Sequence, residues 1–428
     1  MTPAAVPSTA MPTADDSQSI HPMTQHKTDD STGVRSEKAE ATNIEFSRAA
    51  LAGDEVEFVT QAMSAGTLAA GGEFTTMAEE LLSSWHHGAA VLLTTSCTSA
   101  LELAAMTLGI GPGDIVVVPS FTFPTTASAF ARTGARIRFV DIDPITLGMD
   151  PASLAASLDD AVTAVVPVHY GGVACDIDGV LQAARNVGAA VIEDNANGIF
   201  STLREQPLGT FGRMSALSFH QTKSLTCGQG GALVLNDPDD VERAEILADK
   251  GTNRRGFLRG ACSAYTWQLT GSAFALGEAQ AAHLLAQLQR RHLILDRRSE
   301  IWDRYRLALG PVADRLRLTL PHDPGPKSAR HGFYVLVGGE DRRDHILNEL
   351  NSVGIAATFH YQPLHRSPAG RAVSDSPAHC PTADRISAQI LRLPFHNGLS
   401  DNDVDRVITA LVEACRRHPV QPGPHRGT

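Results

Sequence analysis

Residues 216–223 read Ala-Leu-Ser-Phe-His-Gln-Thr-Lys, and Cys-Gly-Gln-Gly-Gly follows at 227–231. The pattern predicts an apolar strand that ends before a lysine, then a glycine-rich turn and a second strand over 232–235. An amine held there is partly desolvated, which lowers its pKa and lets it form a Schiff base with a carbonyl cofactor. An isolated lysine at a hairpin is more often a surface residue, so Lys223 is a candidate only because other segments agree with it.

Short β-rich runs alternate with segments of helical periodicity around this stretch. Alternation of this kind predicts an α/β fold with a mostly parallel sheet covered by helices. After Pro311 the strands are shorter and mix with helices, which predicts a smaller α+β domain. The predicted strands are 115–119, 137–142, 164–168, 190–193, 216–219, 232–235, 333–337 and 356–360, and the predicted helices include 98–108, 177–186 and 276–309.

Composition divides the chain into four segments. Residues 1–41 are rich in Ala, Pro, Thr, Ser and Asp without apolar periodicity, and 416–428 are similar, so both are predicted to be disordered tails. Between them we expect a large domain over 42–290 and a small C-terminal α+β domain over 291–415.

Charge and cysteine usage exclude several classes of protein. The 428 residues carry 36 Lys and Arg against 47 Asp and Glu, a net charge of −11, which disfavours binding of nucleic acid through its phosphates. No apolar run approaches the roughly 18 residues of a membrane-spanning helix. The first residues lack a signal-peptide pattern, and the 6 cysteines form no Cys-x-x-Cys pair. These features predict a reduced, cytoplasmic protein.

A second apolar strand ends in carboxylates, because residues 191–197 read Val-Ile-Glu-Asp-Asn-Ala-Asn. Open α/β sheets bind ligands at the carboxyl ends of their strands. Asp194 could keep a pyridine nitrogen protonated, and a protonated ring makes pyridoxal phosphate an electron sink. Acidic residues at strand ends also cap helices, and this motif alone does not separate the two interpretations.

Residues 94–100, Thr-Thr-Ser-Cys-Thr-Ser-Ala, lead into a predicted helix. Their hydroxyls and free backbone N–H groups could bind a phosphate, although a plain N-cap explains the same letters. Phe123 could stack on a flat ring at the same sheet edge, but such a residue is more often core. Residues 109–113 contain glycines spaced like those of a dinucleotide-binding fingerprint, but they follow a predicted helix and precede a predicted strand. That order is the reverse of the one the fingerprint requires, so these residues are predicted to be a turn. The histidines lack zinc spacing, so no metal is expected.

Six motifs, taken in order, resemble the DegT/DnrJ/StrS sugar-nucleotide aminotransferases over about residues 44–413. They are the segment 94–99, Ser-Phe-Thr-Phe at 120–123, Val-Asp-Ile-Asp at 140–143, Pro-Val-His-Tyr-Gly-Gly at 167–172, Glu-Asp at 193–194 and the run 218–223. Within the family, the dTDP-4-amino-4,6-dideoxygalactose transaminases are the most similar group. The segments that carry this closer resemblance are 250–254, 265–267, 280–282 and 359–365.

The resemblance implies a fold type I enzyme whose large domain binds pyridoxal phosphate. It implies that Lys223 attaches the cofactor and moves a proton between cofactor and substrate, and that Asp194 pairs with the ring nitrogen. It also implies a homodimer with shared active sites, in which Asn253 reaches the neighbour's phosphate. The other implied contacts are Cys97, Thr98 and Ser218 to the phosphate, Phe123 and Asn197 to the ring, and His220, Arg254 and Tyr361 to the nucleotide sugar.

The resemblance further implies a substrate pair. L-Glutamate would donate its amino group to C4 of a dTDP-4-keto-6-deoxyhexose, giving a dTDP-4-amino-4,6-dideoxyhexose. A dTDP-3-keto-sugar 3-aminotransferase is the near alternative, and a catalytically silent regulator that binds pyridoxal phosphate is an alternative of another class. Asn197 replaces a longer Gln of the family pattern, and Leu225 and Gln229 depart from it beside the sugar pocket, so the sugar and its aminated position stay open.

Overall fold

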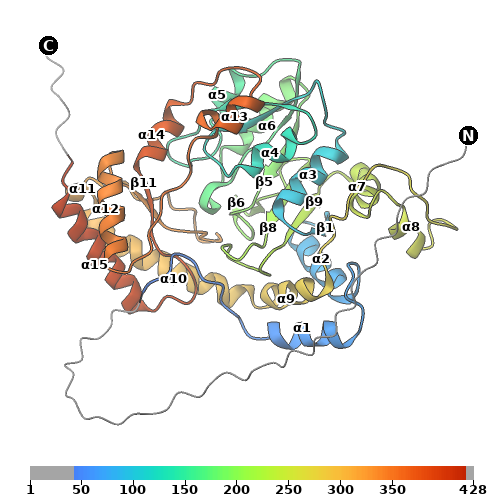
Figure 1. Cartoon of the computed structure of the whole chain (residues 1–428), viewed down its shortest axis with the longest axis horizontal. Helices are drawn as coiled ribbons and strands as arrows, with labels where there is room; N and C mark the ends of the chain where they lie inside the picture. The colour runs from blue at the N-terminus through green and yellow to red at the C-terminus, as the bar shows by residue number, and fades with distance from the viewer. Residues whose placement is uncertain (1–42, 421–428) are drawn as a thin grey trace, which may run out of the picture. The chain divides into compact units, whose positions relative to one another are not determined.

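The computed structural model describes residues 43–420, whose centre is a seven-stranded sheet in the order β1-β9-β8-β5-β4-β2-β3 (Figure 1). Only β9 runs antiparallel to its neighbours, so the sheet is mixed and mostly parallel, as predicted. The strands are β1 (Ala90–Thr94), β2 (Ile115–Pro119), β3 (Arg136–Val140), β4 (Val162–Val165), β5 (Ala190–Asp194), β8 (Met214–Ser218) and β9 (Gly231–Leu235). The sequence analysis did not assign β1.

Both faces of this sheet carry apolar side chains that pack against helices. Successive side chains of a strand point to opposite faces, so an apolar run supplies both. On β2, Val116 and Val118 join the core under α3, α4 and α7, whereas Val117 faces α5 and α6. Helices α2 and α9 cover β1, β8 and β9 on the second face. These helices are α2 (Glu73–Trp85), α3 (Cys97–Thr107), α4 (Thr125–Ala131), α5 (Pro151–Ala155), α6 (Ile177–Asn186), α7 (Val241–Ala248) and α9 (Glu278–Gln289).

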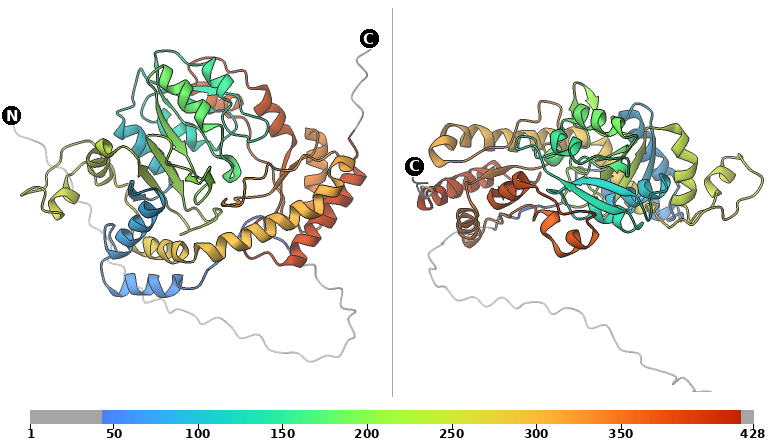
Figure 2. Two further views of the ribbon diagram at one scale, coloured as in Figure 1. Left: turned by 180° about the vertical axis from the view of Figure 1, so that it is seen from behind. Right: turned by 90° about the horizontal axis from the view of Figure 1, so that it is seen from above.

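The C-terminal part has its own core, in which α10, α12 and α15 pack around a two-stranded antiparallel sheet of β10 and β11. Figure 2 shows α9 and α10 following one another from the large sheet to the C-terminal helices. The elements are α10 (Arg291–Leu309), η3 (Gly310–Val312), α11 (Ala313–Leu316), β10 (Tyr334–Leu336), α12 (Glu340–Ser352), η4 (Leu364–Arg366), α13 (Pro368–Val373), α14 (Pro381–Gln389), β11 (Ile390–Arg392) and α15 (Asp401–Arg417).

Short elements complete the fold. They are α1 (Glu55–Ser64), η1 (Tyr170–Gly172), the hairpin β6 (Thr202–Leu203) and β7 (Gln206–Pro207), η2 (Pro238–Asp240) and α8 (Arg254–Leu258). The described residues belong to one compact unit, and the predicted tail 1–41 lies outside the described part. Within residues 43–420, no helix combines the length and apolar character that crossing a bilayer requires.

Three predicted boundaries need correction. The helix predicted over 276–309 is two helices that meet at Arg290. The strand predicted over 356–360 is wrong, since only Thr358 bridges to Arg392 before the chain turns towards the edge of the large sheet. Helix α15 continues to Arg417, inside the predicted tail 416–428, and residues from 421 lie outside the described part. The domain division at 290 falls at the α9–α10 junction and stays a prediction.

Residues 364–384 attach to the edge of the large sheet where β2 and β3 end. The Asp141 carboxylate accepts hydrogen bonds from the backbone N–H groups of Thr382 and Ala383, at 2.9 and 2.8 Å, and so caps α14. The Ser120 hydroxyl lies 2.6 Å from Nδ1 of His365. These contacts hold the chain that follows Tyr361 against the carboxyl ends of the strands.

Glu278, at the start of α9, satisfies the first turn of α2. Its buried carboxylate accepts the backbone N–H groups of Gly72, Phe74 and Thr75, at 2.9, 3.0 and 3.1 Å, and the Thr75 hydroxyl. The first N–H groups of a helix have no partner within the helix, so this side chain replaces a local N-cap.

We expect Glu278→Ala to lower the free energy of unfolding by about 3 kcal/mol, because buried N–H groups lose a charged acceptor. Urea-induced unfolding measures the change. Glu300→Ala is the control, since Glu300 is exposed and pairs with Arg297, and an exposed ion pair contributes below about 1 kcal/mol. Equal effects of the two substitutions would contradict this role of Glu278.

Candidate active site

A cavity of about 470 Å³ opens at the carboxyl ends of β5 and β8. It brings together all of the predicted site residues except Asn253 and Arg254. A larger and more open hollow beside α10 contains none of them. The predicted residues that line the cavity are Cys97, Thr98, Phe123, Asp194, Asn197, Ser218, His220, Lys223 and Tyr361.

Asp194 is the last residue of β5 and is 5% exposed. Its Oδ2 accepts a hydrogen bond of 2.7 Å from the Thr126 hydroxyl, and its Oδ1 accepts one of 3.2 Å from the backbone N–H of Ala196. Burial raises the pKa of this carboxyl, and the two hydrogen bonds oppose the shift in part. A buried carboxylate with so few donors favours a cationic partner in the cavity.

Lys223 follows β8 in a turn that is closed by a 2.8 Å hydrogen bond from its backbone N–H to the His220 carbonyl. Within residues 43–420, none of the ion pairs includes its amine. Burial lowers the pKa of Lys223, although Cys97 and Asp194 oppose the shift. A lysine of lowered pKa has more neutral amine at neutral pH, and the neutral amine is the nucleophile that attacks a carbonyl.

The N-terminus of α3 forms one wall of the cavity. The Ser96 side chain caps the helix by accepting the backbone N–H of Ser99 at 3.0 Å. The N–H groups of Cys97 and Thr98 occupy the first turn, where an α-helix supplies no acceptor, and they can bind an anion. Burial raises the pKa of the Cys97 thiol, so it stays protonated and does not repel an anion.

Gly231 lets β9 approach this helix terminus closely. A Cβ atom at position 231 would overlap the backbone of Ser96 and Cys97. Ser218, the last residue of β8, pairs with Gly231 across the sheet and lines the same cavity. The helix N-terminus therefore keeps its place because residue 231 has no side chain.

Two further predicted residues differ in burial. Phe123 is 53% exposed and lines the cavity, with its ring centroid 6.1 Å from that of Tyr361. It is not a core residue and keeps a free face for stacking on a planar group. Asn197 is 7% exposed and lies beside Asp194 in the wall of the cavity.

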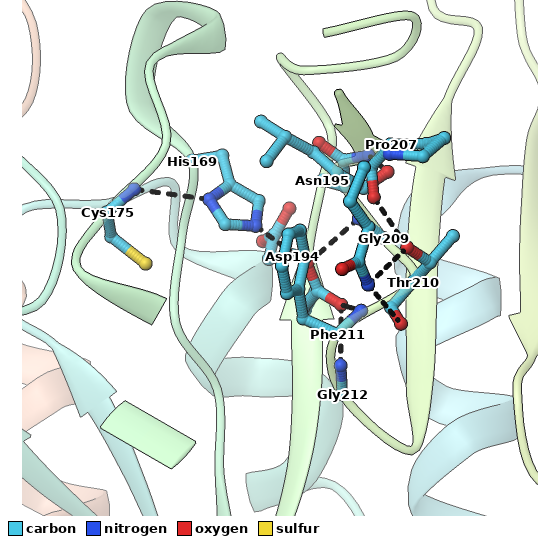
Figure 3. Close-up of polar contacts among 12 residues, drawn as sticks. His169, Cys175, Asp194, Asn195, Pro207, Gly209, Thr210, Phe211 and Gly212 are labelled. Atoms are coloured by element: carbon cyan, nitrogen blue, oxygen red, sulfur yellow. Dashed lines mark hydrogen bonds and ion pairs between the residues drawn. The ribbon is translucent and has the colours of Figure 1, made fainter. Parts of the chain in front are cut away.

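The two adjacent carboxylates of β5 have different surroundings. Glu193 is fully buried, and His169 and the 209–212 loop converge on the end of β5 (Figure 3). Its carboxylate accepts N–H groups of Gly209, Phe211 and Gly212 at 2.7–2.8 Å and Nε2 of His169 at 2.8 Å. Burial raises its pKa, but the bonds to His169 and the backbone outweigh burial and lower it. Glu193 therefore anchors the loop, and Asp194 faces the cavity.

The sequence analysis missed residues that reach the cavity from distant segments. The Tyr170 hydroxyl lies 3.0 Å from Nδ1 of His360. His331, Arg392 and Phe46 line the same wall. Tyr170 and His360 lie in motifs quoted above, at 167–172 and 359–365, but were not named as site residues. No quoted motif contains His331, Arg392 or Phe46, and the contact between the C-terminal part and the sheet brings them here.

Asn253 and Arg254 lie away from this cavity, in and beside α8. The Asn253 Oδ1 accepts the backbone N–H of Thr266 at 2.7 Å, and Arg254 lies 3.6 Å from the carboxylate of Asp249. Their predicted contacts with cofactor and sugar therefore require another copy of the chain or a different loop position. In the described part of the chain, no group of three or more His, Cys, Asp and Glu side chains is placed to hold a metal ion.

Comparison with known proteins gives a consistent set of relatives. A family model described as the DegT/DnrJ/EryC1/StrS aminotransferase family matches residues 50–412. The spore coat polysaccharide biosynthesis protein SpsC of Bacillus subtilis is 32% identical, over 85% of this chain and 95% of its own. GDP-perosamine synthase of Caulobacter vibrioides is 33% identical, over 84% and 95%. The dTDP-4-dehydro-2,3,6-trideoxy-D-glucose 4-aminotransferase of Saccharopolyspora spinosa is 32% identical, over 78% and 87%.

Solved structures agree with these sequence matches. The putative sugar aminotransferase Spr1654 of Streptococcus pneumoniae, in its PMP form, superposes with a TM-score of 0.81 at 26% identity, covering 88% of this chain and 100% of its own. Its PLP form gives a TM-score of 0.80 with the same coverage.

The residues of the cavity fit pyridoxal phosphate. The α3 N-terminus suits a phosphate, the Lys223 amine suits a carbonyl, and Asp194 suits a protonated ring nitrogen. Phe123 offers a free aromatic face. These groups share one cavity although they come from separate segments of the chain.

We expect Gly231→Ala to weaken binding of pyridoxal phosphate to the apoprotein by about tenfold, because the added methyl displaces the first turn of α3. An absorbance titration measures the affinity. Gly111→Ala is the control, since the nearest atom to its new Cβ is 3.7 Å away. An unchanged affinity in Gly231→Ala would contradict the assignment of the phosphate site.

Proposed function

The chain belongs to the DegT/DnrJ/EryC1/StrS aminotransferase family, and from this premise we propose that it aminates C4 of a dTDP-4-keto-6-deoxyhexose with L-glutamate as donor. The product is a dTDP-4-amino-4,6-dideoxyhexose. The coarser activity follows from the family itself, because its members are sugar aminotransferases, and the cofactor is pyridoxal phosphate.

One observation supports the proposal most directly: an amine of lowered pKa and a buried carboxylate line the same cavity. Bound pyridoxal phosphate supplies the carbonyl that carries the amino group from donor to acceptor. Lys223 would hold the cofactor through its Nζ, and the same nitrogen would move a proton to and from the reacting carbon of the substrate. Asp194 would keep the ring nitrogen protonated, and Cys97, Thr98 and Ser218 would bind the phosphate.

The choice of C4 and dTDP rests on relatives. The Saccharopolyspora spinosa relative is named as a 4-aminotransferase of a dTDP sugar, which supports both features. GDP-perosamine synthase carries GDP in its name, so a GDP-linked sugar is the competing nucleotide substrate. Amination at C3 is the second candidate. A catalytically silent regulator would hold pyridoxal phosphate with the same amine and carboxylate, and a spectral titration with glutamate distinguishes it because it would not convert the cofactor to the amine form.

We expect wild-type protein with L-glutamate to aminate dTDP-4-keto-6-deoxyglucose at C4, as mass spectrometry and NMR of the product would show. Lys223→Ala should lose turnover by about 10⁴-fold or more, because the group that moves the proton is gone. Borohydride reduction of the wild type followed by peptide mapping should label position 223. GDP-linked and 3-keto sugars serve as competitors, and amination of one of these in place of the dTDP-4-keto sugar would refute the substrate.

We further propose a homodimer in which α8 and the loop after it reach the neighbour's active site, where Asn253 contacts the phosphate. His220, Arg254 and Tyr361 would then contact the nucleotide sugar. The loop presents unusually exposed apolar side chains for a free surface, with Tyr265 54% and Trp267 75% exposed. A two-fold contact would bury them on both copies at once.

We expect Trp267→Glu to shift the protein towards the monomer in sedimentation velocity and to reduce turnover in proportion to the dimer lost, because a buried charge opposes association. Leu307→Glu is the control, since Leu307 is 77% exposed on α10, away from the loop. A wild type that is monomeric at all accessible concentrations, yet fully active, would refute the shared site.

A further inference from the structure

Arg392, the last residue of β11, points into the active-site cavity and is 9% exposed. Within residues 43–420, no carboxylate forms an ion pair with its guanidinium. Its Nη1 lies 3.4 Å from both ring nitrogens of His360, a separation too long for a strong hydrogen bond. The ring of Phe46 lies 5.1 Å away. A buried guanidinium that meets no carboxylate among the described residues is an unfavourable arrangement unless an anion joins it.

His331 provides a second polar group on the same wall. It is 6% exposed, and its Nδ1 is buried without a hydrogen-bond partner among the described residues. Its backbone is fixed, because the His331 carbonyl accepts a 2.7 Å hydrogen bond from Arg298. Gly332, the next residue, lies so close to Arg392 that a Cβ there would overlap Nη2. The fold therefore holds the imidazole and the guanidinium side by side.

The charge of this wall favours an anion. Burial and the nearby charges of Lys223 and Arg392 hold the pKa of His331 below its usual value, so the ring is neutral and has one N–H to donate. Burial and Arg392 likewise lower the pKa of His360. Asp194 is the carboxylate that lines the cavity, and it already accepts hydrogen bonds from Thr126 and Ala196.

We propose that Arg392 and His331 form a carboxylate-binding subsite that holds the amino donor. This inference rests on the proposed function, which assigns glutamate as donor. A guanidinium binds a carboxylate through two parallel N–H···O bonds, and the neutral imidazole adds a third donor. The cofactor phosphate has a separate place at the N-terminus of α3, and the proposed keto sugar carries no carboxylate. The keto sugar carries its negative charge on the diphosphate at C1, across the ring from the proposed C4, whereas glutamate carries a carboxylate on the carbon that bears its amine. The donor is therefore the substrate that brings a carboxylate to the wall of the cavity that Lys223 lines.

The test uses the holoenzyme and two measurements on Arg392→Met. Calorimetry measures the binding of glutarate, a dicarboxylate that lacks an amine and cannot react. We expect its dissociation constant to rise roughly 30-fold or more, because the variant lacks the charged partner of the carboxylate. Rapid mixing follows the two half-reactions separately. The KM for glutamate should rise by a similar factor, whereas the reaction of the aminated enzyme with the keto sugar should change by less than about threefold.

Matched variants separate recognition from folding. Arg392→Lys should recover part of the affinity, since it keeps the charge but lacks the planar fork. His331→Phe should weaken glutarate binding by roughly tenfold, through the loss of one hydrogen bond to a charged group. Arg306→Met is the control, because Arg306 is a half-buried arginine on α10 that lines the other hollow. It should bind glutarate like the wild type.

Three outcomes would overturn the subsite. These are wild-type glutarate affinity in Arg392→Met, a loss confined to the sugar half-reaction, or equal losses in both half-reactions together with a lower unfolding temperature. If the wild type binds glutarate in an Arg392-dependent way but transfers no amino group to any sugar, the proposed function fails while the subsite stands. The two failures are therefore distinguishable.

Discussion

The buried carboxylate of Asp194 is the constraint on which the rest of the cavity depends. A charge held at the end of β5 is tolerated only where donors or a cation compensate for lost water, and the part of the chain that the structure describes donates to it a hydroxyl and one backbone N–H. The backbone of Asp194 also bonds to residues 167 and 169, which fixes its direction. The same strand therefore positions an anion and leaves room for a cationic ring beside it.

Glu193 shows that neighbouring acidic residues need not share a role. Strand alternation directs it away from the cavity, where three backbone N–H groups and His169 surround it. This network joins the strand to the loop at 209–212, so β5 cannot slide without breaking charged hydrogen bonds. The sequence alone shows two adjacent acidic residues. The pleat of the strand assigns them different roles, because it points Glu193 towards the loop at 209–212 and Asp194 towards the cavity.

The sequence predicted most of the sheet because short valine-rich runs bounded by turn residues adopt few secondary structures other than a buried strand. It predicted helix 177–186 with its observed limits. It missed β1, whose five residues pair antiparallel with β9 and follow α2 after a connection of residues 86–89. The residues at strand ends, Lys223 and Asp194, could be placed together because parallel strands bring their carboxyl ends to one edge. His331, Arg392 and Phe46 could not, since tertiary contacts between distant segments bring them to the cavity.

Asn253 and Arg254 illustrate a different limit. Local hydrogen bonds and an ion pair already engage both side chains within their own loop. A role at the active site therefore requires either another copy of the chain or a different position of this loop. Arg392 is the opposite case, because it lies inside the cavity of its own chain yet has no anionic partner within residues 43–420. Arg392 is therefore explained by an anionic ligand in the proposed subsite, whereas Asn253 and Arg254 would reach the cavity only under the proposed homodimer or with a different loop position.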